Sequence, residues 1–254
     1  MKLYWFGTAA LMLESGDTAI AFDPFLGIAP GDTEGGPAGK APALADCKDV
    51  FVTHGHFDHI LQIPAICPDA RIYATGTPCR TLHGLPHLRE ISPGQTMKVG
   101  PFTICTYQGR HCRFNPGIIA RTAVSARVWS NLRHMLRLLR WNRAYAENGE
   151  ILFYEVCAES IRVQIMGSLG LDPDTDYPTG ADVLLLPYQG RSDLAAYALP
   201  LVERLAPKRV LLDHHDDSFP PVTSEIDTTG FEELLTGRGI PCRALRKYET
   251  MQLD

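Results

Sequence analysis

Four side chains that can bind a metal ion lie within six residues of this chain. His54, His56, Asp58 and His59 follow an apolar run, residues 49–53, that is typical of a buried strand. A loop that leaves such a strand can turn closely spaced side chains into one pocket. Neutral imidazoles together with a carboxylate suit zinc and similar first-row ions. The sequence therefore predicts a metal site at the end of this strand.

Composition and charge exclude several classes of protein. The 254 residues are 45% hydrophobic and 21% charged, which is typical of a globular protein and excludes a disordered or fibrous one. The net charge of −5 argues against a nucleic-acid partner, and no apolar run approaches the ~20 residues of a transmembrane helix. The first residues do not resemble an export signal, and the seven cysteines show no C-x-x-C pair. We therefore expect a cytoplasmic protein with reduced thiols.

Short apolar runs separated by turn residues predict strands in both halves of the chain, and a helical pattern over residues 128–139 separates the two sets. Two more helical stretches are expected near residues 193–205 and 230–237. We expect one domain over residues 1–254, with a helical insertion at about 114–148. This order predicts an α/β protein in which stacked sheets are covered by helices. The expected strands are 3–6, 10–13, 19–22, 49–53, 71–74, 96–99, 102–107, 151–156, 161–166, 183–186 and 209–212.

Several of these motifs resemble those of the metallo-β-lactamase superfamily of metal-dependent hydrolases. Residues 54–59 match its H-x-H-x-D-H signature. Asp23, at the end of a predicted strand, resembles the early strand-end aspartate of the family. His111 and His214 resemble its third and last metal histidines. The opening residues 4–8 are similar to the branch that contains ascorbate-6-phosphate lactonase and N-acyl-phosphatidylethanolamine phospholipase D.

The resemblance implies an αββα sandwich with one or two metal ions at the edge between the sheets. Zinc is the expected metal, with manganese or iron as alternatives. A metal-bound hydroxide would hydrolyse an ester, lactone or phosphodiester bond of a small anionic or lipid-like substrate. Asp58 and His214 would be catalytic, and Asp23 would orient a histidine ligand from behind. The six expected ligands form one set for each ion: His54, His56 and His111, and then Asp58, His59 and His214.

The chain departs from the family at one position. Most members carry an aspartate that bridges the two metals after the strand that ends here at Met166, whereas this chain has Ser168. A neutral hydroxyl is a far weaker ligand than a carboxylate, and two cations repel unless anionic ligands lie between them. Three outcomes stay open: a single ion, another bridging group, or a degenerate, non-catalytic metal-binding protein. The candidate carboxylates are Asp172, Asp213 and Asp216, and His215 is the alternative to His214 as the last ligand.

Eight arginines and no acidic residue occur between residues 110 and 143, so the rest of the chain, with 16 basic and 29 acidic residues, has a net charge of −13. This asymmetry has three interpretations. The helix is a lid whose Arg133, Arg137 and Arg140 bind an anionic substrate. Alternatively, it is a peripheral membrane contact, or it packs on the core or on a second copy of the chain in a homo-oligomer. In the membrane interpretation, the residues facing lipid are Trp129, Leu132, Leu136 and Trp141.

Overall fold

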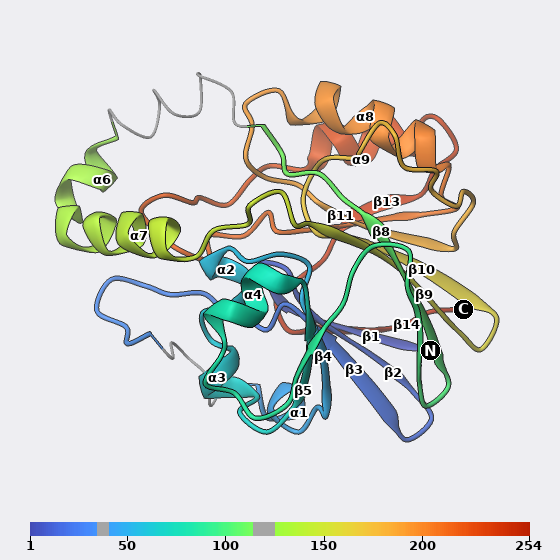
Figure 1. The fold of residues 1–254 in the computed structure, drawn as a ribbon. Helices are drawn as coiled ribbons and strands as arrows, with labels where there is room; N and C mark the ends of the chain where they lie inside the picture. The colour runs from blue at the N-terminus through green and yellow to red at the C-terminus, as the bar shows by residue number, and fades with distance from the viewer. Residues whose placement is uncertain (35–40, 114–124) are drawn as a thin grey trace.

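Two seven-stranded sheets stack face to face in the computed structural model, which describes residues 1–34, 41–113 and 125–254 (Figure 1). Residues 114–124 of the expected insertion therefore lie outside the described part. The strands of the first sheet, in spatial order, are β14 (Glu249–Gln252), β1 (Lys2–Gly7), β2 (Ala10–Ser15), β3 (Thr18–Phe22), β4 (Asp49–Phe51), β5 (Arg71–Ala74) and β6 (Leu88–Glu90). Those of the second are β13 (Cys242–Ala244), β12 (Val210–Asp213), β11 (Val183–Pro187), β10 (Ile161–Met166), β9 (Leu152–Ala158), β8 (Phe102–Gln108) and β7 (Thr96–Val99).

Each sheet has an antiparallel half and a parallel half. Strands β14, β1, β2 and β3 pair antiparallel, whereas β3 to β6 run parallel. In the second sheet, β7 to β10 are antiparallel and β10 to β13 are parallel. Parallel strands are covered on both faces and therefore read as continuous apolar runs, as in β11, where all five residues are buried. Neighbouring parallel strands end at the same edge of their sheet, which brings the loops that follow them together.

Helices cover the outer face of each sheet and complete four layers. The first sheet is covered by α1 (Pro42–Ala45), α2 (Phe57–Ile60), α3 (Ile63–Ile66) and α4 (Gly76–Thr81), and the second by α8 (Leu194–Leu205) and α9 (Thr229–Thr236) (Figure 1). One apolar cluster fills the space between the sheets, and one lies under each helical layer. The expected αββα sandwich is confirmed. Helices α8 and α9 form where the apolar periodicity predicts them.

The helices α6 (Ala126–Ser130) and α7 (Leu132–Ala144) lie at one end of the sandwich (Figure 1). Leu138 and Trp141 of α7 are buried against Phe57 and Phe219. The expectation that Trp141 faces outward is therefore wrong, because its indole packs on the ring of Phe57, with centroids 6.0 Å apart. Within the described residues, every helix is too short or too polar to cross a bilayer.

Candidate metal centre

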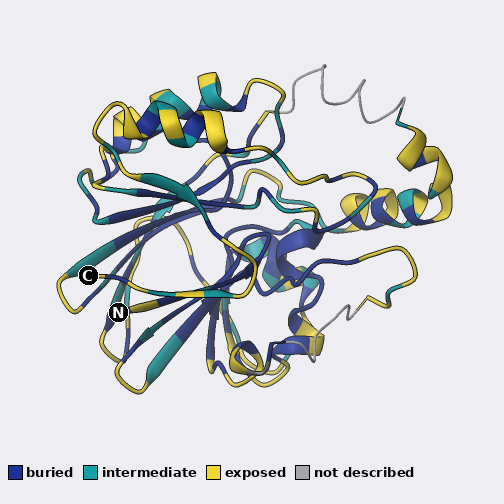
Figure 2. Ribbon diagram, turned by 180° about the vertical axis from the view of Figure 1, so that it is seen from behind, coloured by how far each residue is buried: buried dark blue, intermediate teal, exposed yellow. Residues whose placement is uncertain are grey.

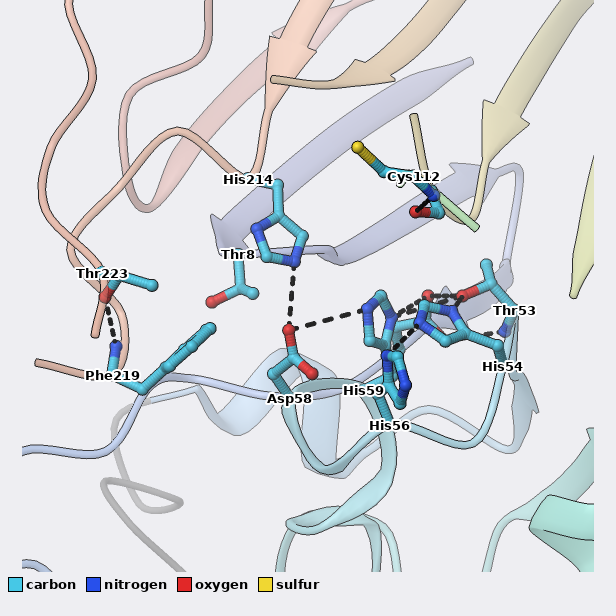
Figure 3. A network of polar contacts seen from close by, with 12 residues as sticks. Thr8, Thr53, His54, His56, Asp58, His59, Cys112, His214, Phe219 and Thr223 are labelled. Carbon is cyan, nitrogen blue, oxygen red and sulfur yellow. Dashed lines mark hydrogen bonds and ion pairs between the residues drawn. The ribbon is translucent and has the colours of Figure 1, made fainter. Parts of the chain in front are cut away.

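The predicted metal-binding residues lie where strands of both sheets end. Asp23 follows β3 and Thr53 follows the neighbouring parallel strand β4, so both residues leave their sheet at the same edge. His111 comes after β8 and His214 directly after β12, in the second sheet. Figure 3 shows His214 pointing towards Asp58 in the loop that follows β4. Residues far apart in the chain therefore meet at one edge of the sandwich.

Three imidazole rings form what we name the first triad: His54, His56 and His111. One nitrogen of each ring lies within 4.8 Å of those of the other two, and Nε2 of His54 is 3.1 Å from Nδ1 of His56. Burial is the main cause that lowers the pKa of all three rings, to about 4 for His56. The rings are therefore neutral at pH 7, the form in which a histidine nitrogen offers its lone pair to a metal.

The second triad consists of Asp58, His59 and His214, whose ligand atoms also lie within 4.8 Å of one another. Oδ2 of Asp58 is 3.3 Å from Nε2 of His214 and 3.8 Å from Nε2 of His59. Burial alone would raise the pKa of the Asp58 carboxyl, but the neighbouring histidines outweigh it and hold that pKa below its usual value. Burial likewise opposes charge on His214, yet the hydrogen bond with Asp58 raises its pKa to about 8. These surroundings therefore favour positive charge on the His214 side of the triad and an ionised carboxylate on Asp58.

Asp23 and Thr53 connect the two triads through hydrogen bonds to one histidine of each, His59 and His54. The carboxylate of Asp23 accepts hydrogen bonds from the backbone N–H of Thr53 (2.8 Å), the Thr53 hydroxyl (2.6 Å) and Nδ1 of His59 (2.8 Å). Because the single hydroxyl proton of Thr53 goes to Asp23, its Oγ1 accepts from Nδ1 of His54, 3.1 Å away. Both histidines then carry their lone pair on Nε2. The buried pair thus sets the tautomer of one ring in each triad.

The donor set fits bound metal ions. Nδ1 of His111 donates to the carbonyl of Cys112 at 2.8 Å, which puts the lone pair of that ring on Nε2. The facing nitrogens of His54 and His56, 3.1 Å apart, repel unless a proton or a cation lies between them. Neutral imidazoles in the first triad, and imidazoles with an ionised carboxylate in the second, match the ligands that zinc and similar ions take in proteins.

His214, rather than His215, is brought to the centre. Nε2 of His215 is hydrogen-bonded to the carbonyl of Leu245 at 3.0 Å, and its ring lies on Trp5 with centroids 5.2 Å apart. His215 therefore packs in the molecule behind the centre. The hydroxyl of Ser168, which the sequence predicts in place of a bridging aspartate, accepts a hydrogen bond from the backbone N–H of Cys112 at 3.0 Å. It thus helps to hold the segment that carries His111.

The loop after β1 holds His214 in place, a role that was not predicted from the sequence. The carbonyl of Thr8 accepts a hydrogen bond from the backbone N–H of His214 (2.9 Å), and the N–H of Thr8 donates to Asp216 (2.9 Å). Thr8, Asp23 and His214 all have positive φ angles, between 45° and 56°, a region that costs energy for residues other than glycine. Such strained residues gather at functional sites. The Gly7-Thr8 turn was the available signal in the sequence, as was the position of Thr53 next to His54.

Replacing Asp23 by asparagine is expected to weaken metal binding by about 10- to 100-fold, because an amide cannot accept all three hydrogen bonds and releases the ring of His59. The variant should also lose about 1–3 kcal/mol of unfolding free energy, since buried partners are left unsatisfied. Competition titrations with a chromogenic chelator and urea unfolding measure the two effects. Asp46→Asn, at an exposed residue, is the matched control. Metal affinity equal to that of the wild type would contradict the role given to Asp23.

Two clefts have volumes of about 640 Å³ each. The first lies beside the helices α6 and α7, and the second lies beside the first triad. The first is lined by Arg133 and Arg137 of α7, but Arg137 already donates to the carbonyl of Asp32 at 2.7 Å. The second contains His111 of the first triad and, on either side of it, Arg110 and Cys112. The lining of this second cleft includes none of the three arginines expected to bind substrate, and that assignment stays a prediction.

A family model described as the beta-lactamase superfamily domain matches residues 2–214. The chain belongs to this superfamily. The chain is similar to a UPF0173 metal-dependent hydrolase of Methylobacterium nodulans, with 27% identity over an alignment that covers 94% of each chain. Two solved structures are similar to this chain. One is the metallo hydrolase Igni18 of Ignicoccus hospitalis, with 18% identity and a TM-score of 0.63, and the other is an isothiocyanate hydrolase from Delia radicum gut bacteria, with 16% identity and a TM-score of 0.62. Each alignment covers 100% of this chain and 99% of the other. At such identities the two structures show the fold alone. The predicted superfamily and sandwich are confirmed.

Proposed function

We propose that the two triads of this metal-dependent hydrolase each hold one metal ion, and that the protein cleaves an ester, lactone or phosphodiester bond in a small anionic or lipid-like substrate. One observation carries the proposal: two sets of three ligand atoms, each set within 4.8 Å, gather at one edge of a beta-lactamase superfamily sandwich. Curated relatives from Methylobacterium nodulans and Halobacterium salinarum are named metal-dependent hydrolases and support the same class of enzyme. Zinc is the metal that we propose, because the ligands are imidazoles and a carboxylate.

Metal ions held by His54, His56 and His111 and by Asp58, His59 and His214 would lower the pKa of bound water and polarise the bond to be cleaved. The protein residues must then orient the reactants and move protons. Asp58, whose carboxyl is kept ionised by His59 and His214, is placed to accept a proton at Oδ2. Nε2 of His214 lies 3.3 Å from that oxygen and would complete the second triad as a ligand. Its surroundings, which favour positive charge, would also suit negative charge on the reacting group, and Asp58 would pass the proton on to the leaving group.

Ser168 supports a second candidate function, a metal-binding protein without catalysis. Its hydroxyl accepts from the Cys112 N–H and adds no negative charge between the triads. We nevertheless favour the hydrolase, because Asp58 supplies an ionised carboxylate within the second triad. The branch that contains ascorbate-6-phosphate lactonase, and a cytoplasmic location, remain predictions from the sequence.

The experiment that separates the two functions is an activity screen with metal analysis. The purified protein, with Zn²⁺ or Mn²⁺ added, is assayed on chromogenic esters, lactones and bis-aryl phosphodiesters. We expect hydrolysis of at least one class, and we expect its loss in His56→Ala, with Lys98→Gln at an exposed site as the control. Stoichiometric metal without hydrolysis of any class would favour the non-catalytic function. Failure to bind metal at all would contradict both.

We propose that the substrate anion contacts Arg110, because this exposed residue lines the same cleft as His111. Loss of one charge-assisted hydrogen bond should raise KM of Arg110→Gln by about tenfold. The matched variant Arg133→Gln/Arg140→Gln, on α7, should leave KM for a water-soluble anionic substrate unchanged. Steady-state kinetics on the best substrate of the screen measure both. The reverse pattern, with KM raised only in the α7 variant, would instead support the lid predicted from the sequence.

A further inference from the structure

Large apolar side chains are exposed along one side of α6 and α7. Trp129, Leu132, Leu136 and Leu139 are 66%, 46%, 58% and 51% exposed, and they make up four of the six exposed large hydrophobic residues in the described part of the chain. Figure 2 shows this end of the molecule as mostly exposed. We name these four residues the outer apolar face. The spacing of three or four residues places the three leucines along one side of α7, away from the buried Leu138. Trp129, on α6, lines the first cleft together with Leu132.

Arginines surround the outer apolar face. Residues 126–144 contain five arginines and no acidic residue. Arg127 pairs with Asp217, and Arg137 donates to the carbonyl of Asp32. The other three, Arg133, Arg140 and Arg143, are exposed, and no ion pair joins them to another described residue. The helices thus present apolar side chains and uncompensated positive charge on the same surface.

We propose that the outer apolar face docks on a membrane that contains anionic phospholipids. Tryptophan and leucine side chains beside arginines are the combination with which helices bind at a lipid surface, the apolar groups entering the acyl boundary and the guanidinium groups meeting phosphates. A second copy of the chain fits less well, because joining two such faces would bring together six arginines, Arg133, Arg140 and Arg143 of each copy, that no ion pair joins to another described residue. The chain outside residues 110–143, with a net charge of −13, would be repelled by the same membrane, which orients the protein with this face towards the lipid.

A cleft beside the outer apolar face and a ring contact behind α7 relate this surface to a lipid headgroup and to the metal centre. The first cleft, of about 640 Å³, opens beside Trp129 and Arg133, next to the outer apolar face. It is large enough for a phosphate headgroup. On the opposite side of α7, Trp141 packs on Phe57, which lies between the ligands His56 and Asp58 in the chain. A docked helix would therefore bring the metal centre close to the lipid surface, as a lipid-like substrate requires.

Vesicle sedimentation tests the proposal. The full chain is mixed with vesicles of phosphatidylcholine alone, or with vesicles in which about one lipid in four is phosphatidylglycerol. We expect binding only to the anionic vesicles, and weaker binding as salt is added. Arg133→Gln/Arg140→Gln/Arg143→Gln should reduce the affinity by about fivefold for each arginine, about 100-fold in all. The control, Lys48→Gln/Arg89→Gln/Lys98→Gln, removes the same charge from exposed residues elsewhere and should bind like the wild type.

A second variant tests the apolar part of the surface. Trp129→Ser/Leu136→Ser should lose vesicle binding, and its thermal unfolding should match that of the wild type, because both side chains are exposed. Equal binding to neutral and anionic vesicles, or no binding, would overturn the proposal. So would a wild-type dimer that this variant converts to a monomer in analytical ultracentrifugation, because a second copy would then cover the face. These measurements need no substrate, so a negative result would leave the proposed hydrolase untouched.

Discussion

Removal of the metal ions is expected to lower the hydrolase activity by at least about 10³-fold, because the water-activating and charge-stabilising chemistry depends on the cation. The residues of the first triad are neutral at pH 7, so on their own they supply no positive charge to an anionic transition state. Dialysis against a chelator, followed by kinetics on the best substrate of the screen, measures the loss. Inductively coupled plasma mass spectrometry gives the metal content of the same samples.

Restoration completes the test of metal dependence. Zn²⁺ titrated into the metal-free protein should restore activity, with saturation at two equivalents if both triads are occupied and at one if only the first is. Far-ultraviolet circular dichroism should be the same before and after chelation, because the three main apolar clusters do not depend on the site residues. Full activity in demonstrably metal-free protein would refute the proposed function.

Asp58→Asn is expected to reduce kcat/KM by about 10² to 10⁴-fold, the range for loss of a positioned acid or base. Asparagine keeps the shape of the side chain but cannot be ionised or accept a proton at Oδ2. The variant should also retain about one equivalent less metal, because a neutral amide is a weaker ligand than a carboxylate in the second triad.

The Asp58→Asn variant can also be tested through the pKa of His214. Burial lowers the pKa of this ring, and the hydrogen bond and charge of Asp58 are the largest causes that raise it to about 8, so the pKa of His214 should fall in metal-free Asp58→Asn. Nuclear magnetic resonance titration of the ring protons measures this shift, and Asp17→Asn, in an exposed turn, is the matched control. Wild-type activity together with an unchanged His214 titration would show that Asp58 has neither role.

Most strands could be predicted because their residues are apolar over the whole run or in alternation. The helices α8 and α9 were predicted from their apolar periodicity for the same reason. The strands β6, β13 and β14 were missed, since they are three or four residues long and half-buried or exposed. Their extended conformation depends on pairing with β5, β12 and β1, and such long-range pairs leave little local signal.

Which side of α7 is buried could not be predicted from its sequence. An apolar stripe normally marks the buried face of a helix, yet here Leu132, Leu136 and Leu139 are exposed while Leu138 and Trp141 are buried. The helix carries apolar residues on two sides, and the aromatic rings at the end of the sandwich, Phe57 among them, select the side that contains Trp141.

The sequence by itself determined the chemistry that the protein can perform. The closely spaced histidines and aspartate of residues 54–59 can offer lone pairs to a metal ion, because those lone pairs belong to the side chains. Only the tertiary structure decided which distant residues join them, and that His214 rather than His215 does so. The physical reason is that the positions of Asp23, His111 and His214 depend on how two sheets stack and where their strands end, which is settled by burial and pairing across the whole chain.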